Sequence, residues 1–97
     1  MSPETLAGIR VQLPPLLRNL MGGERWLTGD GDSIVAVLAD LGRKHPSLAL
    51  HFFDEQGALR HNIAFVHDGA VIRAREAAAH AVGPGDELIL TTALAGG

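Results

Sequence analysis

Only one long segment of this 97-residue chain has the apolar spacing of a helix, and this feature limits the fold more than any other. The apolar residues of the segment recur at i, i+3, i+4 and i+7, and they are Ile34, Val37, Leu38 and Leu41. Asp32 or Ser33 can cap the first turn, and the helix is expected to end near His45 because a proline follows it. A single amphipathic helix has to bury its apolar side against a sheet. The sequence therefore predicts an α+β fold.

Alternating apolar and polar residues predict strands before this helix. The segment "GIRVQLP" (8–14) is expected to form a half-buried strand, and "ERWLTG" (24–29) a second strand antiparallel to the first. The stretch "PPLLRNLMGG" (14–23) joins them and carries two prolines and two glycines. We expect it to be a long connection whose leucines cover one end of the core.

After the helix, residues 48–73 have the composition of two or three strands separated by turns. The turns are marked by "DEQG" and "HDG", and Asp68-Gly69 is the usual sequence of a tight hairpin. Residues 74–82 are rich in alanine and predict a short helical turn, after which "GPGD" must reverse the chain. The final strand is predicted at "ELILTT" (87–92).

Composition narrows the class of function before any motif is considered. The net charge is −3 and the pI is about 5.9, so neither nucleic acid nor an anionic membrane is an expected partner. The chain contains no cysteine, which excludes disulfides, thiolate metal sites and a thiol nucleophile of its own. The first residues do not have the pattern of a secretory signal, and a cytoplasmic location is expected. The length suits one domain covering residues 1–97.

Neither the histidines nor the acidic residues form a recognised catalytic or metal-binding motif. The histidines lack ligand-pair spacing, so we expect solvated or singly hydrogen-bonded side chains and no metal at His45, His51, His61, His67 and His80. Two of them, His51 and His61, are expected in neighbouring strands. The acidic residues that could suggest an acid–base pair fall at predicted turns, where aspartate bonds to nearby backbone: Asp30, Asp32, Asp54 and Glu55.

The order of the elements, together with the ending "ALAGG" (93–97), resembles the ubiquitin-like β-grasp family and, within it, the sulfur carriers of the MoaD and ThiS type. The resemblance rests on segments that span most of the chain: "IRVQLP", "DSIVAVLADLGRKHPSL", "FVHDGAVIR" and "GPGDELILTTALAGG". It implies a mixed sheet of four to five strands packed on one main helix. It also implies a flexible C-terminal tail at about residues 93–97.

The same resemblance implies a function that depends on the last residue. Proteins of this family are not enzymes; a ubiquitin-activating-type enzyme uses ATP and Mg to adenylate their C-terminal carboxylate, which here would be that of Gly97. A sulfurtransferase or another sulfide source then converts the adenylate to a thiocarboxylate, which donates its sulfur to a biosynthetic enzyme. The partner would recognise the tail at Leu94, Ala95 and Gly96, and glycines suit a narrow channel because they have no Cβ.

The resemblance further places the sheet face beside the tail against partner enzymes, which indicates Arg60, Arg73 and Arg75 as interface residues. The receiving pathway stays open among molybdopterin, the thiazole of thiamin, cysteine and a sulfur-containing secondary metabolite. Two other functions also stay open. One is a ubiquitin-like modifier that is joined through Gly97 to lysines of target proteins, and the other is a binding module whose tail is incidental.

Overall fold

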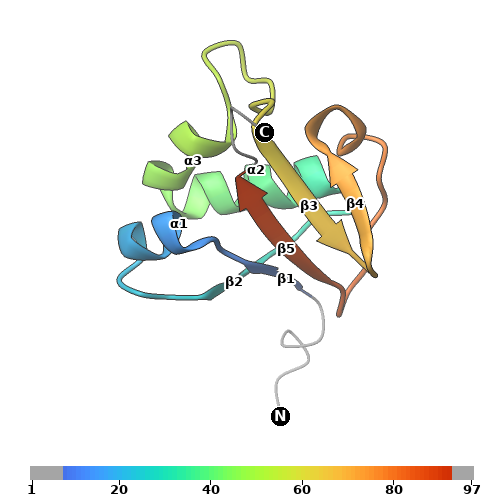
Figure 1. Cartoon of the computed structure of the whole chain (residues 1–97), viewed down its shortest axis with the longest axis horizontal. Coiled ribbons are helices and arrows are strands. Elements are labelled where there is room, and N and C mark those ends of the chain that lie inside the picture. The colour runs from blue at the N-terminus through green and yellow to red at the C-terminus, as the bar shows by residue number, and fades with distance from the viewer. Residues whose placement is uncertain (1–7, 93–97) are drawn as a thin grey trace.

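The computed structural model describes residues 8–92, in which a five-stranded mixed sheet packs on helices that cover one of its faces (Figure 1). The elements in chain order are β1 (Ile9–Gln12), α1 (Pro15–Leu20), β2 (Trp26–Gly29), α2 (Ile34–Lys44), α3 (Pro46–Phe52), β3 (Ile63–His67), β4 (Ala70–Arg73), the 3-10 turn η2 (Ala74–Glu76) and β5 (Glu87–Thr92). No helix within this part of the chain is long and apolar enough to cross a membrane. The predicted α+β class is confirmed.

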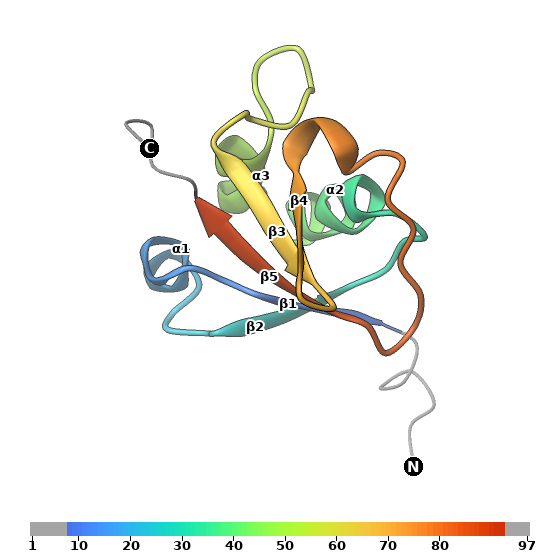
Figure 2. The ribbon, with the colours of Figure 1, turned by 45° about the vertical axis from the view of Figure 1, so that its right-hand side comes forward.

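The last strand lies in the middle of the sheet. The strand order is β2-β1-β5-β3-β4, so β5 is hydrogen-bonded to a strand on each side (Figure 2). Its pairing with β1 is parallel and its pairing with β3 is antiparallel, whereas the outer pairs β1–β2 and β3–β4 are antiparallel. The sheet is therefore mixed, as expected, and its two halves are joined only by the strand that ends the described chain.

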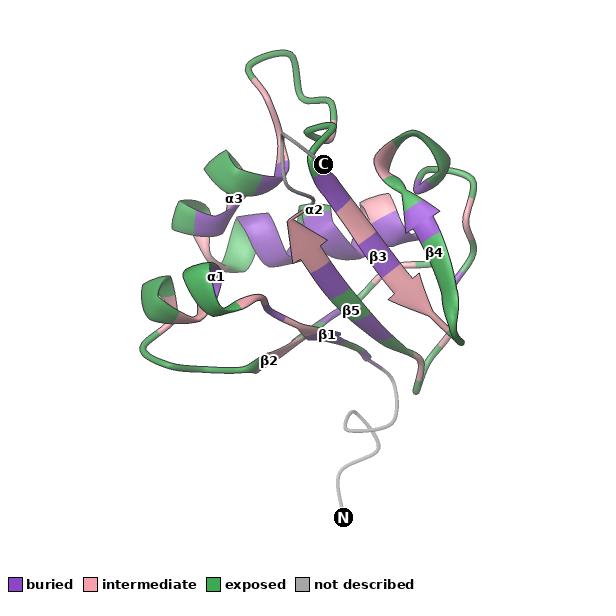
Figure 3. Cartoon of the chain, in the orientation of Figure 1, coloured by how far each residue is buried: buried purple, intermediate pink, exposed green. Residues whose placement is uncertain are grey.

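The core lies between the sheet and α2. Alternate residues of the three central strands are buried with at most 2% exposure, and they are Ile9, Val11, Ile63, Phe65, Leu88 and Leu90. The predicted helical stripe meets them from α2 with no exposed surface at any of its four positions. In Figure 3 the buried residues accordingly alternate with exposed or intermediate ones along β5 and β3.

The ends of α2 agree with the prediction. The Ser33 hydroxyl accepts a hydrogen bond from the Ala36 backbone N–H at 3.2 Å, which is the expected N-cap contact. At the other end the His45 N–H donates to the Leu41 carbonyl at 2.8 Å. The helix thus covers Ile34–Lys44, with His45 as its C-cap, and ends near His45 as predicted.

The strand expected directly after α2 is wrong, because residues Pro46–Phe52 form the helix α3. Pro46 ends α2, but it also occupies the first turn of α3, where its missing N–H has no consequence. Leu48 and Phe52, four residues apart, are both fully buried, so the segment packs its apolar residues at helical spacing. His51 consequently lies on a helix and is not in a strand beside His61.

The stretch expected to be an irregular connection between β1 and β2 also contains a helix, α1. Pro15 stands in its first turn, so this proline begins a helix where the sequence suggested a break. The leucines do not all cover the core, since Leu17 is buried while Leu16 and Leu20 are 65% and 43% exposed.

The predicted turns of the second half are confirmed. Asp68 and Gly69 both have positive φ, 53° and 81°, as a tight hairpin turn between β3 and β4 requires. The alanine-rich segment begins with the 3-10 turn η2, and the residues after it reverse the chain into β5.

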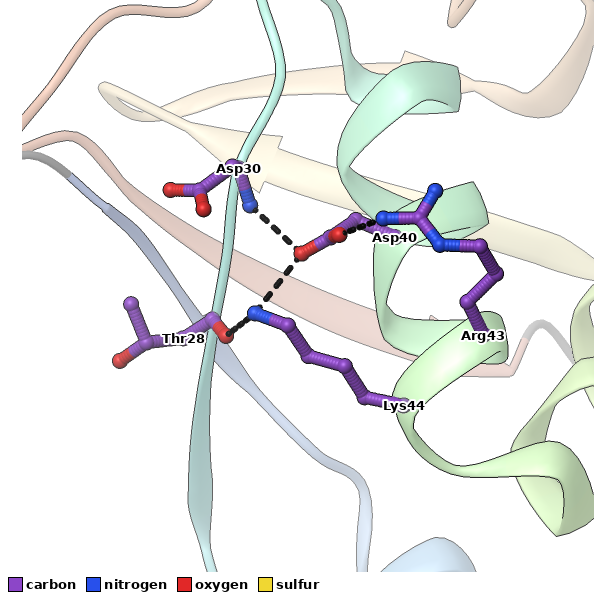
Figure 4. A network of polar contacts seen from close by, with 5 residues as sticks. All are labelled: Thr28, Asp30, Asp40, Arg43 and Lys44. Carbon is purple, nitrogen blue, oxygen red and sulfur yellow. Dashed lines mark hydrogen bonds and ion pairs between the residues drawn. The ribbon is translucent and has the colours of Figure 1, made fainter.

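A buried carboxylate fastens α2 to the end of β2 (Figure 4). Asp40 is 6% exposed and accepts hydrogen bonds from the Asp30 backbone N–H at 3.0 Å and from the Lys44 ammonium at 2.9 Å. Arg43 bonds to its other oxygen, and Lys44 also reaches the Thr28 carbonyl at 3.5 Å. The Lys44 and Asp30 hydrogen bonds hold the pKa of Asp40 below its usual value, although burial opposes them.

We expect Leu38→Ala to lower the free energy of unfolding by about 2–5 kcal/mol, because it leaves a cavity where α2 meets the sheet. Urea unfolding at neutral pH measures the change. The matched control is Leu50→Ala, which removes the same atoms from a leucine that is 72% exposed. A control change as large as that of Leu38→Ala would contradict the assigned orientation of the helices.

Asp40→Asn should lower the free energy of unfolding at pH 7 by about 1.5–3 kcal/mol, because the charged acceptor of three donors is lost. Since the folded-state pKa of Asp40 lies below the ordinary value, its contribution is present above pH ~4 and disappears as the pH falls through the folded pKa. The difference between parent and variant should therefore shrink below pH ~4. The control Asp68→Asn changes a carboxylate that is 91% exposed and should leave the stability nearly unchanged. An equal difference at pH 3 and pH 7 would exclude this role of the charge.

Candidate functional site

The sequence predicts a functional site in the C-terminal tail, and the nearest part of the molecule that the structure describes is the surface around the end of β5. Leu94, Ala95, Gly96 and Gly97, to which sequence analysis assigned activation and recognition, lie outside the described residues. Thr92 is the last described residue, and it pairs with Ile63 at the start of β3. The described chain therefore ends beside β3, at the end where β3 begins.

On its other side, β5 extends past its parallel neighbour and leaves a shallow hollow. The pairing with β1 stops at Gln12 and Ile89, three residues before β5 ends. The hollow has a volume of about 440 Å³ and is lined by Pro14, Arg18 and Thr92 among others. The guanidinium of Arg18 donates to the Leu13 carbonyl at 2.8 Å, so this wall of the hollow is held in place. The end of β5 thus lies next to an open surface that a partner can contact.

The sheet face that the helices leave uncovered carries a row of side chains across all five strands. We call it the exposed row, and its members in sheet order are Trp26, Gln12, Ile89, Val66 and Val71. Val71 is 64% exposed and Ile89 is 40% exposed. Ile89, Val66 and Val71 form a contiguous apolar group within this row, and such a group on an open face is a feature of protein-binding surfaces. Ile89 lies on β5, the strand that leads toward the tail.

Charged side chains flank the exposed row. Arg10 lies over the Trp26 ring at 4.2 Å and forms an ion pair with Glu87 at 2.6 Å. The side chains of Arg10 and Glu87 are about half exposed, at 48% and 53%, so water screens the pair and its contribution to stability is small. The contacts instead keep the guanidinium on the open face, where it can meet a partner.

Two of the three predicted interface arginines lie together where β4 ends, one strand away from the end of β5, and the third lies apart. Arg73 and Arg75 line a pocket of about 170 Å³ whose wall also includes His61 and Ile63. Arg60 does not line this pocket, and its Nε donates to the Leu50 carbonyl at 2.9 Å. The sequence did not indicate His61 as a neighbour of these arginines. The residues are distant in sequence, and the pairing of β3 with β4 brings them together.

Two histidines and an aspartate form a hydrogen-bond chain at the opposite end of β5. His67 Nδ1 lies 2.7 Å from His80 Nε2, and His67 Nε2 lies 3.2 Å from Asp86 Oδ2. The Gly83 backbone N–H donates to the same carboxylate oxygen at 2.8 Å, and this bond is the largest cause of the lowered pKa of Asp86. His67 bonds through both ring nitrogens, so the expectation of single hydrogen bonds is wrong for it. These hydrogen bonds join the β3–β4 hairpin to the loop before β5.

Nothing in residues 8–92 gathers three or more histidine, aspartate or glutamate side chains in the geometry of a metal site. Of the acidic residues interpreted as turn formers, Asp54 confirms this role because its Oδ1 accepts the N–H groups of Gln56 and Ala58 at 2.9 and 3.0 Å. The backbone of Asp30 contributes to the Asp40 network.

The model of the ThiS family matches residues 11–97 of the chain, which include all the described strands except the first two residues of β1. No curated protein sequence is significantly similar to the chain. Among solved structures, the chain is similar to small archaeal modifier protein 1 of Haloferax volcanii, at 27% identity and a TM-score of 0.75. The match covers 93% of this chain and 99% of that one.

Two further solved structures have the same fold over nearly the whole chain. Small archaeal modifier protein 1 of Methanosarcina acetivorans is 25% identical with a TM-score of 0.69, covering 94% of this chain and 97% of that one. CysO of Amycolatopsis orientalis, in a complex with BexX, is 24% identical with a TM-score of 0.74, covering 92% and 99%. The strand order and the central position of β5 are thus those of the ubiquitin-like β-grasp fold.

Proposed function

Because this chain belongs to the ThiS family, we propose that it is a sulfur carrier protein that acts through the carboxylate of Gly97. The observation that carries the proposal is the family match, which continues through Gly97. The position of β5 supports the proposal. This strand leads to residues 93–97, and its last residue, Thr92, lines an open hollow on the surface. We propose that the protein is a cosubstrate and not an enzyme, and that it works in the cytoplasm.

The proposed chemistry begins with activation of a poor electrophile. The Gly97 carboxylate attacks the α-phosphorus of ATP in a partner enzyme, and pyrophosphate leaves with its Mg²⁺. The acyl-adenylate has AMP as leaving group, so its carbonyl accepts a nucleophile that the carboxylate would repel. Hydrosulfide attacks this carbonyl, AMP departs, and a thiocarboxylate remains. Where a sulfurtransferase rather than another sulfide source supplies the sulfur, a thiol reductant first releases it from the enzyme's persulfide as hydrosulfide. A biosynthetic enzyme then takes the sulfur.

This chemistry explains why glycines are suited to the end of the proposed tail. Gly96 and Gly97 have no Cβ, so their backbone can approach ATP closely and at angles that other residues avoid. Leu94 and Ala95 have side chains and would supply the contacts that hold the tail in its channel. The tail requires the glycines at its end, where the reacting carbonyl must fit.

A second candidate function is attachment to other proteins. Its support is the similarity to a protein named small archaeal modifier protein 1, at 27% identity. Both functions pass through the same adenylate and differ in whether sulfide or a lysine amine attacks it. Lys44 is the only lysine of the chain, and its ammonium contacts Asp40 and the Thr28 carbonyl, so lysine-linked self-chains would have to disrupt that network.

Affinity capture of the protein from its own cells distinguishes the two functions. If the protein is a sulfur carrier, only the unconjugated protein should be captured. Part of it should carry the mass gain of one oxygen replaced by sulfur. A modifier predicts higher-mass conjugates that, after tryptic digestion, leave residues 76–97 attached to target lysines, because Arg75 is the last basic residue of the chain. Remnants found without any thiocarboxylate would overturn the carrier proposal in favour of the modifier.

The proposed partner surface is the exposed row, with Arg73 and Arg75 beside it. We expect Ile89→Asp to raise the KM for the carrier in adenylation by roughly tenfold, because a charge enters an apolar contact on the central strand. Pyrophosphate release by the cognate activating enzyme measures the change. Leu50→Asp, at an exposed leucine of α3, is the matched control and should leave KM unchanged. Equal KM values for parent and Ile89→Asp, with both proteins folded, would exclude this face.

Deletion of Gly97 and the substitution Gly96→Phe should each abolish adenylation and thiocarboxylation without changing the melting temperature. The first leaves the carboxylate one residue short of ATP, and the second puts a bulky side chain into the channel. Intact-mass spectrometry after incubation with the activating enzyme, ATP and sulfide measures the product. A substitution in the turn at the far end of the sheet, Asp68→Asn, is the control and should be converted like the parent. Conversion of either tail variant at the parent rate would show that Gly97 is not the reacting residue.

A further inference from the structure

Two adjoining pockets lie where β3 begins, and they differ in chemistry. The first, of about 170 Å³, is the pocket of Arg73, Arg75 and His61. The second, of about 360 Å³, has mainly apolar walls that include Phe53 and Leu59. Both pockets share His61, Ala74 and Arg75, so they form one hollow with a cationic half and an apolar half. We call it the two-part hollow.

The cationic half has positive groups available for a ligand. Among residues 8–92 no ion pair includes Arg73 or Arg75, and both side chains are exposed. The carboxylate nearest in sequence, that of Glu76, accepts a hydrogen bond from the Arg73 backbone N–H at 2.9 Å. The chain as a whole has a net charge of −3, so this basic pocket is a local feature of the surface. A guanidinium pair of this kind is suited to a carboxylate.

The apolar half has walls that the chain itself only partly covers. Phe53 and Leu59 pack against the core from one side, with Val35 of α2 beside them, and all three stay partly exposed. Figure 2 shows the elements that make the hollow, the 3-10 turn after β4 and the connection from α3 to β3, at the same end of the molecule. A large aliphatic or aromatic side chain can displace water from these walls.

We propose that the two-part hollow binds a segment of the activating enzyme in which a large apolar side chain is followed by a glutamate or aspartate. The carboxylate lies between Arg73 and Arg75, and the apolar side chain packs against Phe53 and Leu59, which are paired side by side in one wall of the second pocket. This inference rests on the proposed function and names the chemistry of its partner. Charge complementarity assigns the acidic residue, and the larger volume and apolar lining of the second pocket assign its neighbour.

The position of the hollow explains what such a contact does. Ile63 lines the cationic half and is also the residue that pairs with Thr92 at the end of β5. A partner segment held there fixes the body of the carrier one strand away from Thr92, the last described residue. The distance from that anchor to the ATP site then sets how far the tail reaches, which is an effect of positioning. A free phosphate could fill the cationic half only, and it would leave the apolar half empty.

A peptide titration of the isolated chain tests the hollow without the activating enzyme. The probe is the acetylated, amidated tetrapeptide Gly-Leu-Glu-Gly, and the matched probe has glutamine in place of glutamate. We expect saturable NMR shifts of the Leu59, Ala74 and Ala78 amides with the glutamate probe, and binding roughly fivefold weaker with the glutamine probe. Absence of saturable shifts at these amides up to about 10 mM probe would overturn the proposal. The same shifts with inorganic phosphate alone would also overturn it and would identify an anion site.

Variants of the hollow separate its two halves. Arg73→Gln combined with Arg75→Gln should weaken the glutamate probe roughly fivefold and leave the glutamine probe unaffected, whereas Arg25→Gln, outside the hollow, should change neither. Ala78→Glu places a carboxylate in the apolar half and should abolish binding of both probes. The adjacent Ala79→Glu is its control, because Ala79 is exposed and does not line the hollow. Equal effects of the two alanine variants would overturn the assignment of the site.

Kinetics with the activating enzyme connect the hollow to the proposed function. The double arginine variant should raise KM for the carrier and leave kcat unchanged, whereas the tail variants lose kcat. Failure of the parent to be adenylated would count against the proposed function, while the peptide titration would still decide whether the hollow binds its ligand. An unchanged KM for the arginine variant, with the parent active, would show that the activating enzyme is not the occupant.

Discussion

The pairing of β5 with both β1 and β3 is the interaction on which the rest of the structure depends. The strand last in sequence is the middle strand in space, and its Leu88 and Leu90 lie at the centre of the core. Neither half of the sheet is hydrogen-bonded to the other except through this strand. The same strand leads to residues 93–97, so the segment that completes the fold is also the one that precedes the proposed reacting residue, Gly97.

Charge is distributed over this framework in two different ways. Asp40 is buried and satisfied by Asp30, Arg43 and Lys44, so its charge serves the junction of α2 and β2. Arg73 and Arg75 are exposed and have no ion-pair partner within residues 8–92, so their charge faces outward where β4 ends. The buried network favours one arrangement of the fold, whereas the exposed pair favours one kind of partner. The exposed row, on the face of the sheet opposite α2, completes the proposed binding surface.

Sequence analysis missed the helices α1 and α3 because the sequence pattern at each of them is compatible with two structures. Pro15 and Pro46 interrupt apolar segments, and a proline can equally end one helix or begin the next. The segment from Leu48 to Phe52 is too short for periodicity to separate a helix from a strand. Burial of both residues on one side of α3 decides between them, and burial depends on which elements lie nearby.

The sequence by itself determined the features that arise from neighbouring residues. The spacing of four apolar residues determined α2, Asp68-Gly69 determined the hairpin, and the alternation of residues 87–92 determined β5. Only the tertiary structure decided which distant residues meet, such as His67 with Asp86, or His61 with Arg73 and Arg75. The physical reason is range. Periodicity and turn conformation act over a few bonds, whereas these contacts depend on strand order and register, which the chain sets only when its whole core is packed.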